Sequence, residues 1–321
     1  MSRTTPLRVG LIGLGAVATR FYQTFNEHPD TVIAAVCDVD GARAQQVAAE
    51  NGNVPWHTDH RELLKQDDLD VIYIGVPPKY HHRMALDVLQ AGKHILCEKP
   101  LANSLEEAEE MARAAAEAGV VTAMHFPTYY GAAGAAFANV VYDGFLGELR
   151  RLEVQMHFHQ WPRTWQMNPW VGGREQGGFT REVMVHYLHL IEAIFGPIAS
   201  VTSHLEFPED ESKSETGLIA RMTLEDGTSV LVNGLTDIGQ QELISFTAYG
   251  TEGTLSLRNW SELHIAGFGH LPQRVELPQV ASTSILVSEL VRAIDGEPAD
   301  LIDFAFGARI QKTLEALLQS K

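Results

Sequence analysis

Glu182 and His186 lie four residues apart in the segment GGFTREVMVHYLHL. In a helix, residues at i and i+4 project from one face about one turn apart, so a carboxylate and an imidazole would point the same way. An imidazole, with an ordinary pKa of about 6.5, suits proton transfer near neutral pH. A plainer interpretation stays open, in which His186 is a hydrogen-bonded core residue and Glu182 is a first-turn carboxylate favoured by the helix dipole.

A lysine stands directly after an apolar run elsewhere in the chain. Residues 93–98 read KHILCE, and Lys99 and Pro100 follow. If Lys99 is partly desolvated beside Glu98, it could donate a hydrogen bond or a proton to a substrate oxygen. For a lysine taken alone, a surface position in a loop is the preferred interpretation.

The segment VGLIGLGAVA follows the first apolar run with closely spaced glycines. Gly13 permits a tight turn, Gly15 lets the backbone approach a pyrophosphate, and Ala18 allows close packing of helix on strand. The helix that opens here offers N–H groups and a positive dipole end to phosphates. We therefore include Ala16 and Val17 in a predicted dinucleotide-binding turn.

Asp38 ends the second apolar run, 20 residues after Ala18. An acidic side chain at this place can accept hydrogen bonds from the hydroxyls of an adenosine ribose. Because the same carboxylate would repel a 2′-phosphate, NAD is favoured over NADP as the cofactor. Arg43 lies close enough in sequence to leave NADP open.

The elements that must position these residues alternate in the first third of the chain. Continuous apolar runs are typical of strands buried on both faces, and they alternate here with helical patterns. The predicted strands are 7–13, 31–38, 70–76, 93–98 and 119–125. The predicted helices are 15–27, 41–51, 60–66, 79–91 and 104–118. The pattern predicts an α/β fold with a doubly wound parallel sheet, and it places Lys99 and Pro77 at the sheet edge where ligands bind.

After about residue 125 the pattern changes to strands separated by turns, with partial period-2 alternation. The predicted strands are 149–159, 199–207, 216–226, 228–236 and 244–257, and the helices are 133–143, 179–195, 283–295 and 301–319. This predicts an α+β domain with a mainly antiparallel sheet. We expect a dinucleotide-binding domain over 1–124 and a substrate-binding and oligomerisation domain over 125–321, whose last helices pack back toward the first domain.

Composition excludes several classes of partner. The 321 residues carry a formal net charge of −17, which argues against nucleic acid and anionic membranes because both repel acidic surfaces. No run approaches the roughly 20 apolar residues of a membrane span, and the N-terminal run is too short for a signal peptide. Cys37 and Cys97 lie in apolar segments, as buried thiols do. A cytoplasmic protein is expected.

The glycine turn, the segment VPPKYH and above all AGKHILCEKPLA resemble the glucose-fructose oxidoreductase / inositol dehydrogenase / rhizopine catabolism family of dinucleotide-dependent oxidoreductases. The resemblance implies a Rossmann domain, then a domain with a large open sheet that commonly makes homo-oligomer contacts, here a homodimer or homotetramer. It also implies an active site in the cleft between them. Lys99 would lie near nicotinamide and substrate, with Glu98 beside it, and Val76, Pro77 and His81 beside the cofactor.

The resemblance also gives the opening segment a place. Family members often carry G-G-G and then D-x-G-x-H at the start of a helix, with the aspartate and histidine facing the substrate. Glu182 stands at the aspartate position and His186 at the histidine. This implies that His186 is the general acid or base, assisted by Lys99, with Glu182 orienting the imidazole or binding substrate. His189 stands where a later acidic residue often occurs, and Arg181 would bind an anionic substrate group or pair with Glu182.

Aromatic and basic residues gather in MHFHQWPRTWQMNPWVGGRE, residues 156–175. Aromatic planes with polar neighbours suit sugar-like substrates, so Arg163 and Trp165 are predicted substrate contacts. An oligomer contact or a local core explains the tryptophans equally well. His157 and His159 share one face of a strand, but no third ligand has suitable spacing, so no metal is expected.

These residues together predict a nicotinamide-dependent oxidoreductase that interconverts a secondary alcohol and a ketone on a small, carbohydrate-like molecule. Reduction of a C=N or C=C bond, or oxidation of a dihydrodiol, is a second interpretation on the same scaffold. A third is a regulatory protein that senses NAD(P) without catalysis. The altered D-x-G-x-H segment keeps this third interpretation open, and Lys99 and His186 argue against it.

Overall fold

The computed structural model describes residues 5–319 apart from residues 167 and 279. The chain forms two compact units. Unit 1 comprises Met1–His125 and Thr283–Gln311, and unit 2 comprises Phe126–Ser282 and Lys312–Lys321. Among the described residues, no helix is both long enough and apolar enough to cross a membrane.

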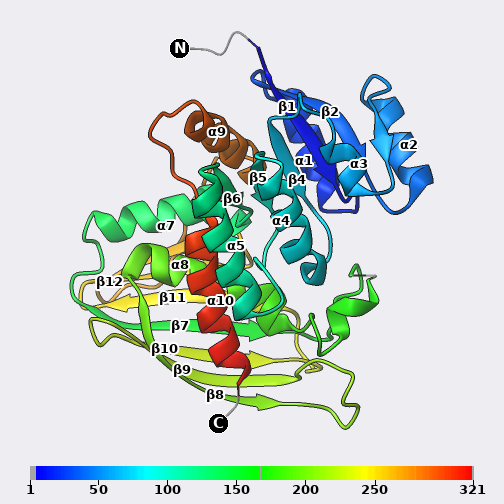
Figure 1. The fold of residues 1–321 in the computed structure, drawn as a ribbon. Coiled ribbons are helices and arrows are strands. Elements are labelled where there is room, and N and C mark those ends of the chain that lie inside the picture. Colours follow the sequence, from blue (N-terminus) through cyan, green and yellow to red (C-terminus); the bar gives the residue numbers. More distant parts are fainter. Residues whose placement is uncertain (1–4, 167, 279, 320–321) are drawn as a thin grey trace. The chain divides into compact units, whose positions relative to one another are not determined.

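Unit 1 is built on a six-stranded parallel sheet of order β3-β2-β1-β4-β5-β6 (Figure 1). Its strands are β1 (Leu7–Ile12), β2 (Thr31–Cys37), β3 (Trp56–His57), β4 (Val71–Ile74), β5 (His94–Cys97) and β6 (Thr122–Met124). The central strands are buried along nearly their whole length, which explains their continuous apolar sequences. The predicted doubly wound parallel sheet is confirmed, and the short β3 is an addition to it.

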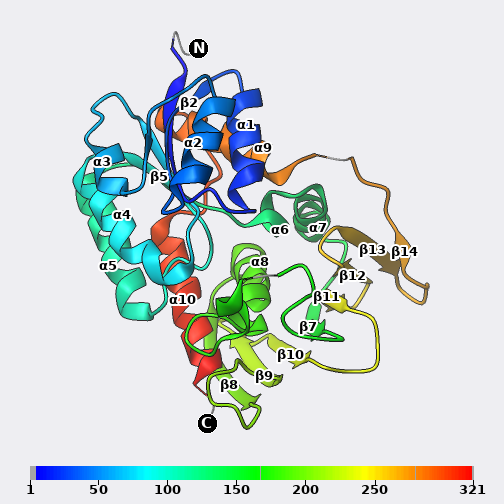
Figure 2. The ribbon, with the colours of Figure 1, turned by 90° about the vertical axis from the view of Figure 1, so that its right-hand side faces the viewer.

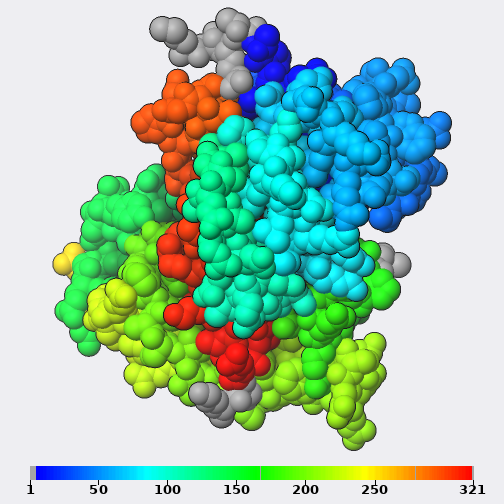
Figure 3. Space-filling view, viewed as in Figure 1, coloured from blue at the N-terminus to red at the C-terminus, as the bar shows by residue number. Residues whose placement is uncertain are grey.

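Helices flank this sheet. They are α1 (Ala18–Glu27), α2 (Gly41–Glu50), α3 (His60–Leu64), the 3-10 turn η1 (Pro78–Tyr80), α4 (His81–Gln90), α5 (Leu105–Ala118) and α9 (Ser282–Ile294). Ser104 caps α5 by accepting a hydrogen bond from the Glu107 N–H at 3.3 Å, and Gly119 ends it in the left-handed conformation. The surfaces of α4 and α5 run side by side in Figure 3.

A segment from the far end of the chain belongs to unit 1. Helix α9 lies beside α1 (Figure 2), and the hydroxyl groups of Thr24 and Thr283 are 2.7 Å apart. Farther along the same pair of helices, the His28 ring and the Ser288 hydroxyl are 3.2 Å apart. Side-chain hydrogen bonds therefore attach α9 to the first helix of the dinucleotide fold.

Unit 2 is built on an eight-stranded sheet of order β14-β13-β12-β11-β7-β10-β9-β8. Its strands are β7 (Leu149–His157), β8 (Ile198–Glu206), β9 (Gly217–Leu224), β10 (Ser229–Leu235), β11 (Leu243–Gly250), β12 (Gly253–Arg258), β13 (Glu262–Gly267) and β14 (Gln273–Arg274). All neighbours are antiparallel except β7 and β10. The predicted mainly antiparallel sheet is confirmed.

One face of this sheet packs on helices of the same unit. Phe246 of β11 is fully buried and stacks on Phe137 of α7 (Ala132–Tyr142), with ring centroids 5.1 Å apart. It also meets Tyr187 of α8 (Val185–Phe195) at 6.1 Å. The next residues along β11 point to the opposite face, which gives the period-2 pattern. The other helices of unit 2 are α6 (Pro127–Tyr130) and the short η2 (Pro169–Gly172) and η3 (Thr180–Met184), while α10 (Phe304–Leu318) begins in unit 1 and ends in unit 2.

One predicted strand was wrong. Residues 244–257 form two antiparallel strands, β11 and β12, joined by a turn at residues 251–252. The buried positions change from Phe246 and Ala248 in β11 to Leu255 and Leu257 in β12, so the period-2 alternation shifts by one residue at the turn. Gly250 lies just before the turn, where a Cβ would lie 2.0 Å from the carbonyl oxygen of Leu146. Strands β13 and β14 were not predicted.

Candidate functional site

The residues that follow the strands of unit 1 are fixed at one edge of the sheet. Each donates its backbone N–H to the neighbouring strand, which extends the ladder one residue beyond the strand end. The bonds run from Gly13 to Cys37 O (2.8 Å), from Gly75 to Ile12 O (2.8 Å), from Glu98 to Ile74 O (3.0 Å) and from His125 to Cys97 O (3.0 Å). The glycine turn, Glu98 and the start of the Lys99 loop therefore share the carboxyl edge of a parallel sheet, where such folds bind ligands.

The glycine turn has the geometry of a phosphate cradle. Gly13 adopts φ +86°, and a Cβ there would lie 2.5 Å from the carbonyl oxygen of Gly75, so only glycine fits. A Cβ on Gly15 would meet nothing within 4 Å, which leaves open space beside the backbone. Helix α1 begins without a side-chain cap, and Ala16 and Val17 are exposed at its start. Its first N–H groups are thus placed to receive an anion.

Asp38 lies at the end of β2 with a buried carboxylate, only 6% exposed. It accepts hydrogen bonds from the backbone N–H of Leu14 at 2.8 Å and of Asp40 at 2.9 Å. The guanidinium of Arg43 is 3.3 Å away. The carboxylate of Asp38, at the end of β2, is therefore hydrogen-bonded to the glycine turn that follows β1. It places an acidic group beside the basic Arg43 at this edge of the sheet.

Glu98 is the centre of a buried network. Tyr73 donates its hydroxyl hydrogen to Glu98 at 3.1 Å, and Nδ1 of His125 lies 2.9 Å from the same oxygen. Burial alone would raise the pKa of Glu98, but the charge and hydrogen bond of His125, the charge of Lys99 and the Tyr73 hydroxyl together hold it below its usual value. An ionised Glu98 thus precedes Lys99, whose side chain is half-buried.

His81 ties two loops of this edge together. The ring is fully buried, with Nδ1 2.9 Å from the carbonyl oxygen of Pro100 and Nε2 2.8 Å from that of Val76. Burial lowers its pKa, and a neutral imidazole has one N–H for these two oxygens. The ring therefore joins the loop after β4 to the loop that carries Lys99, and Pro77, half-buried, lies in the first of these loops.

The segment that carries Glu182 and His186 lies in unit 2. Its predicted single α-helix over 179–195 is wrong in its first turn, because Thr180–Met184 form a wider π-helical turn before α8 begins at Val185. Such turns are frequent at functional sites. Glu182 lies within this turn and is half-buried, whereas His186 is 4% exposed.

The two glycines before this turn are required by close packing. A Cβ on Gly177 would lie 2.2 Å from the carbonyl oxygen of Trp170. Gly178 adopts φ +96°, and a Cβ there would lie 2.2 Å from a carboxylate oxygen of Glu215. The glycines thus let the chain pass between a loop and a buried side chain.

Glu215 is a residue of this site that the sequence did not reveal. It is 3% exposed and accepts a hydrogen bond from the Thr180 N–H at 2.7 Å. Burial raises its pKa, against the hydrogen bonds to Thr180. No local pattern marked it, because its partner is 35 residues away in the chain.

Aromatic rings enclose His186. Phe126 lies edge-on to it with centroids 5.9 Å apart, and Trp260 lies edge-on at 5.3 Å. His189 is fully buried, stacked on Phe126 at 4.5 Å and edge-on to Tyr129 at 4.9 Å. Burial lowers the pKa of His189 to about 3, so it stays neutral. His189 is thus packed among aromatic rings of unit 2, and its contact with substrate stays a prediction.

The two predicted arginine contacts are engaged within unit 2. Arg163 forms a two-point ion pair with Glu242, at 2.7 and 3.1 Å, and its side chain is 10% exposed. Arg181 donates to the carbonyl oxygens of Arg174 at 3.2 Å and Gly177 at 3.5 Å. Both side chains therefore brace the loops around the helix.

Trp165 contrasts with these arginines. It is 71% exposed, with the Arg163 guanidinium 5.9 Å from its ring. Of the predicted substrate contacts, it therefore offers the largest accessible aromatic surface.

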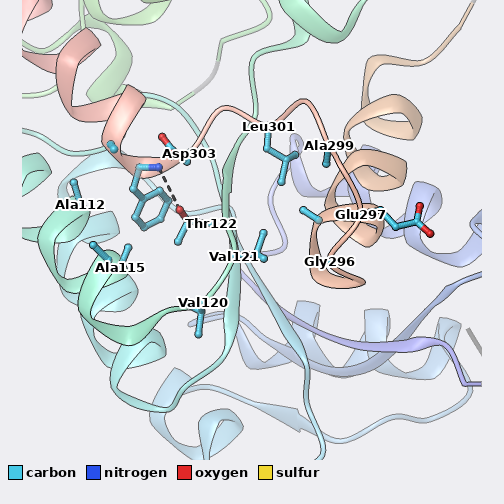
Figure 4. Close-up of a pocket in the computed structure, with 14 residues that line it drawn as sticks. Ala112, Ala115, Val120, Val121, Thr122, Gly296, Glu297, Ala299, Leu301 and Asp303 are labelled. Atoms are coloured by element: carbon cyan, nitrogen blue, oxygen red, sulfur yellow. Dashed lines mark hydrogen bonds between the residues drawn. The ribbon is translucent and has the colours of Figure 1, made fainter.

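A separate groove of about 470 Å³ lies on unit 1 (Figure 4). Small apolar residues of α5 and the start of β6 line it, including Ala112, Ala115 and Val121, opposite residues 296–304. It adjoins the amino end of β6, whereas the glycine turn lies at the carboxyl edge, so the groove is separate from the predicted dinucleotide site. Within the described part of the chain, no three His, Cys, Asp or Glu side chains gather as a metal site.

A parallel sheet with a glycine turn at its carboxyl edge, followed by a large open sheet, defines a Rossmann-type dinucleotide-binding protein with a second α+β domain. The chain belongs to the Gfo/Idh/MocA oxidoreductase family, as the resemblance implied. Residues 7–126 match "Oxidoreductase family, NAD-binding Rossmann fold", and residues 135–256 match "GFO/IDH/MocA C-terminal domain". It is therefore an NAD(P)-dependent oxidoreductase.

Named relatives act on sugars. The dTDP-3,4-didehydro-2,6-dideoxy-alpha-D-glucose 3-reductase of Streptomyces antibioticus is 27% identical over 92% of this chain and 90% of its own length. The 1,5-anhydro-D-fructose reductase of Ensifer adhaerens is 27% identical over 78% of this chain and 76% of its own. Among solved structures, an oxidoreductase domain protein from Kribbella flavida superposes with a TM-score of 0.84 and 25% identity, covering 98% of this chain and 96% of that one.

Replacement of Gly178 tests the packing before the His186 helix. Gly178→Ala should lower the free energy of unfolding by about 3 kcal/mol or more, because it combines positive-φ strain with a clash against Glu215. Gly144→Ala is the matched control, since Gly144 has φ +77° but open space around it, and should cost only about 1 kcal/mol. Chemical denaturation measures both. Equal losses would show that crowding at Gly178 is unimportant.

Proposed function

We propose that this protein interconverts a secondary alcohol and a ketone on a sugar, polyol or related small polar molecule. The observation that carries the proposal is the shared sheet edge of unit 1, which holds the Gly13 turn, Asp38 and the loop of Lys99. A lysine at the edge that binds the dinucleotide is suited to a substrate oxygen beside the reacting carbon. The sugar substrates in the names of two relatives support the same class.

The cofactor in this proposal is held by the carboxyl edge of unit 1. The open space at Gly15 and the uncapped start of α1 fit a pyrophosphate, and Asp38 fits the ribose hydroxyls. Val76, Pro77 and His81 shape the adjoining loop, together with Glu98. When bound, the nicotinamide ring supplies or accepts the hydride at C4.

Lys99, His186 and Glu182 are the proposed proton-handling residues. Lys99 would hydrogen-bond the reacting oxygen, and the ionised Glu98 precedes it in the same loop. His186 would take the hydroxyl proton during oxidation and return it during reduction. Glu182, one turn before it, would orient the imidazole or bind a substrate hydroxyl. Arg163, Arg181 and His189, the other predicted substrate contacts, lie in the same unit as His186 and are held by an ion pair, backbone hydrogen bonds and ring stacking respectively.

Truncation of the two proton-handling residues tests the assignment. Lys99→Ala and His186→Ala should each lower kcat about 100-fold or more, as loss of a general acid or base does, while the Kd for NAD changes only a few fold. Reduced-nicotinamide absorbance with a panel of sugars and polyols measures turnover.

Matched controls use side chains of the same type outside this chemistry. Lys93 precedes β5 at its amino end and donates to the Asp67 carbonyl, and His270 is exposed, so Lys93→Ala and His270→Ala should retain activity. Full activity in both test variants would contradict the roles of Lys99 and His186.

The same substrate panel distinguishes the alternative functions. Tight NAD binding with no turnover of any substrate by the parent protein would favour a regulatory sensor of NAD(P). Turnover only of C=N or C=C substrates or dihydrodiols would favour a reductase of such bonds or a dihydrodiol dehydrogenase.

Asp38 is the proposed source of a preference for NAD over NADP. Its carboxylate would repel a 2′-phosphate, and Arg43 is paired to it. Asp38→Ser should therefore raise the ratio of kcat/KM for NADP over NAD about 10-fold or more. Asp40→Ser is the control, because Asp40 also lies near Arg43 but caps α2, a role that serine preserves. Equal ratios in the two variants would refute the role of Asp38.

We further propose that the protein forms a homodimer or homotetramer through the open sheet of unit 2. The face opposite Phe246 carries exposed Ile219 and Tyr249, at 59% and 38%. Ile219→Glu should lower the mass in sedimentation, whereas Tyr142→Glu, on exposed α7 surface, should not. A parent protein that sediments as a monomer would refute the proposal.

The unpaired buried thiols of Cys37 and Cys97 support a reducing compartment, the cytoplasm.

A further inference from the structure

The turn between β12 and β13 carries a tryptophan in an unfavourable conformation. Asn259 has φ +45° and Trp260 has φ +75°, and the Ser261 N–H bonds the Arg258 carbonyl at 3.2 Å. Two central residues at positive φ make a turn in which Asn-Gly is the preferred pair. Here the glycine position holds the bulkiest side chain, so the local sequence works against the turn.

The ring of Trp260 is held by side chains of unit 2. It stacks on Tyr187 at 6.1 Å with a 28° angle between the planes. The Arg163 guanidinium lies 5.8 Å from its centroid and is itself anchored by Glu242. These contacts compensate the backbone cost, and strain of this kind is concentrated at ligand-binding and active sites.

Trp260 is also a direct neighbour of the proposed acid-base residue. Its ring is edge-on to His186, with the planes at 89°. The side chain is only half-buried, although Tyr187 behind it is fully buried. Its indole N–H is a hydrogen-bond donor. An accessible aromatic surface with one donor thus stands next to His186.

We propose that Trp260 contacts the substrate and selects cyclic sugars over acyclic polyols. The C–H face of a sugar ring is flat and apolar and matches an indole surface, while the indole N–H can donate to a ring hydroxyl. An open-chain polyol has no such face. The inference rests on the proposed function, because it assigns the substrate class to the site of His186.

Trp260→Leu tests the contact. For cyclic sugars KM should rise about 10-fold, equivalent to about 1.4 kcal/mol, while kcat changes less than about 3-fold. For acyclic polyols KM should change less than about 3-fold. Phe268→Leu is the matched control, because Phe268 follows the opposite end of β13 and is 83% exposed, and it should leave both KM values unchanged.

The outcomes separate the two proposals. A parent protein that oxidises or reduces no sugar or polyol contradicts the proposed function. A parent protein that turns over cyclic sugars, with equal KM changes for cyclic and acyclic substrates in Trp260→Leu, overturns only the role of Trp260. An equal drop in kcat for both substrate types would show that Trp260 merely supports His186. If Trp260→Leu fails to fold, Trp260→Phe decides by the same cyclic-to-acyclic comparison, with a smaller expected change of about 3-fold.

Discussion

The close approach of Gly13 to the carbonyl oxygen of Gly75 is the constraint on which unit 1 depends. The two residues follow β1 and β4, neighbours in the centre of the parallel sheet, and there is no room for a Cβ between them. The tight turn brings the start of α1 to the carboxyl edge and presents the Leu14 N–H to Asp38. One steric condition thus places a helix N-terminus and a buried carboxylate together, and both fit a dinucleotide.

In unit 2 a buried carboxyl group fixes the segment that precedes α8. Glu215 occupies the space that a side chain on Gly178 would need, and it bonds the first N–H of the π-helical turn. The desolvation that raises its pKa is a cost to the fold. The hydrogen bond to Glu215 fixes the turn that carries Glu182. Helix α8 follows this turn and places His186 between the rings of Phe126 and Trp260. Rigid support of this kind is what proton transfer requires of its residues.

Residues marked by local spacing lie in the fold where the sequence placed them. The Gly13 turn follows the first strand, Asp38 ends the second, and Lys99 comes directly after a buried strand, because each is defined by its distance from an apolar run. The start of α8 was less accurate. Its π-helical turn is hydrogen-bonded at the Thr180 N–H by Glu215, a partner 35 residues away that no helical period can encode.

By itself, the sequence determined the two sheets, the family and the position of the glycine turn at one edge of unit 1, since strand periodicity and glycine spacing act over a few residues. Only the tertiary structure decided which polar side chains are available. Arg163 forms an ion pair with Glu242, 79 residues away, and His189 packs against Phe126 and Tyr129. Trp260, which no motif marked, lies against His186. Burial and pairing depend on contacts between distant segments, and those contacts exist only once the chain has folded.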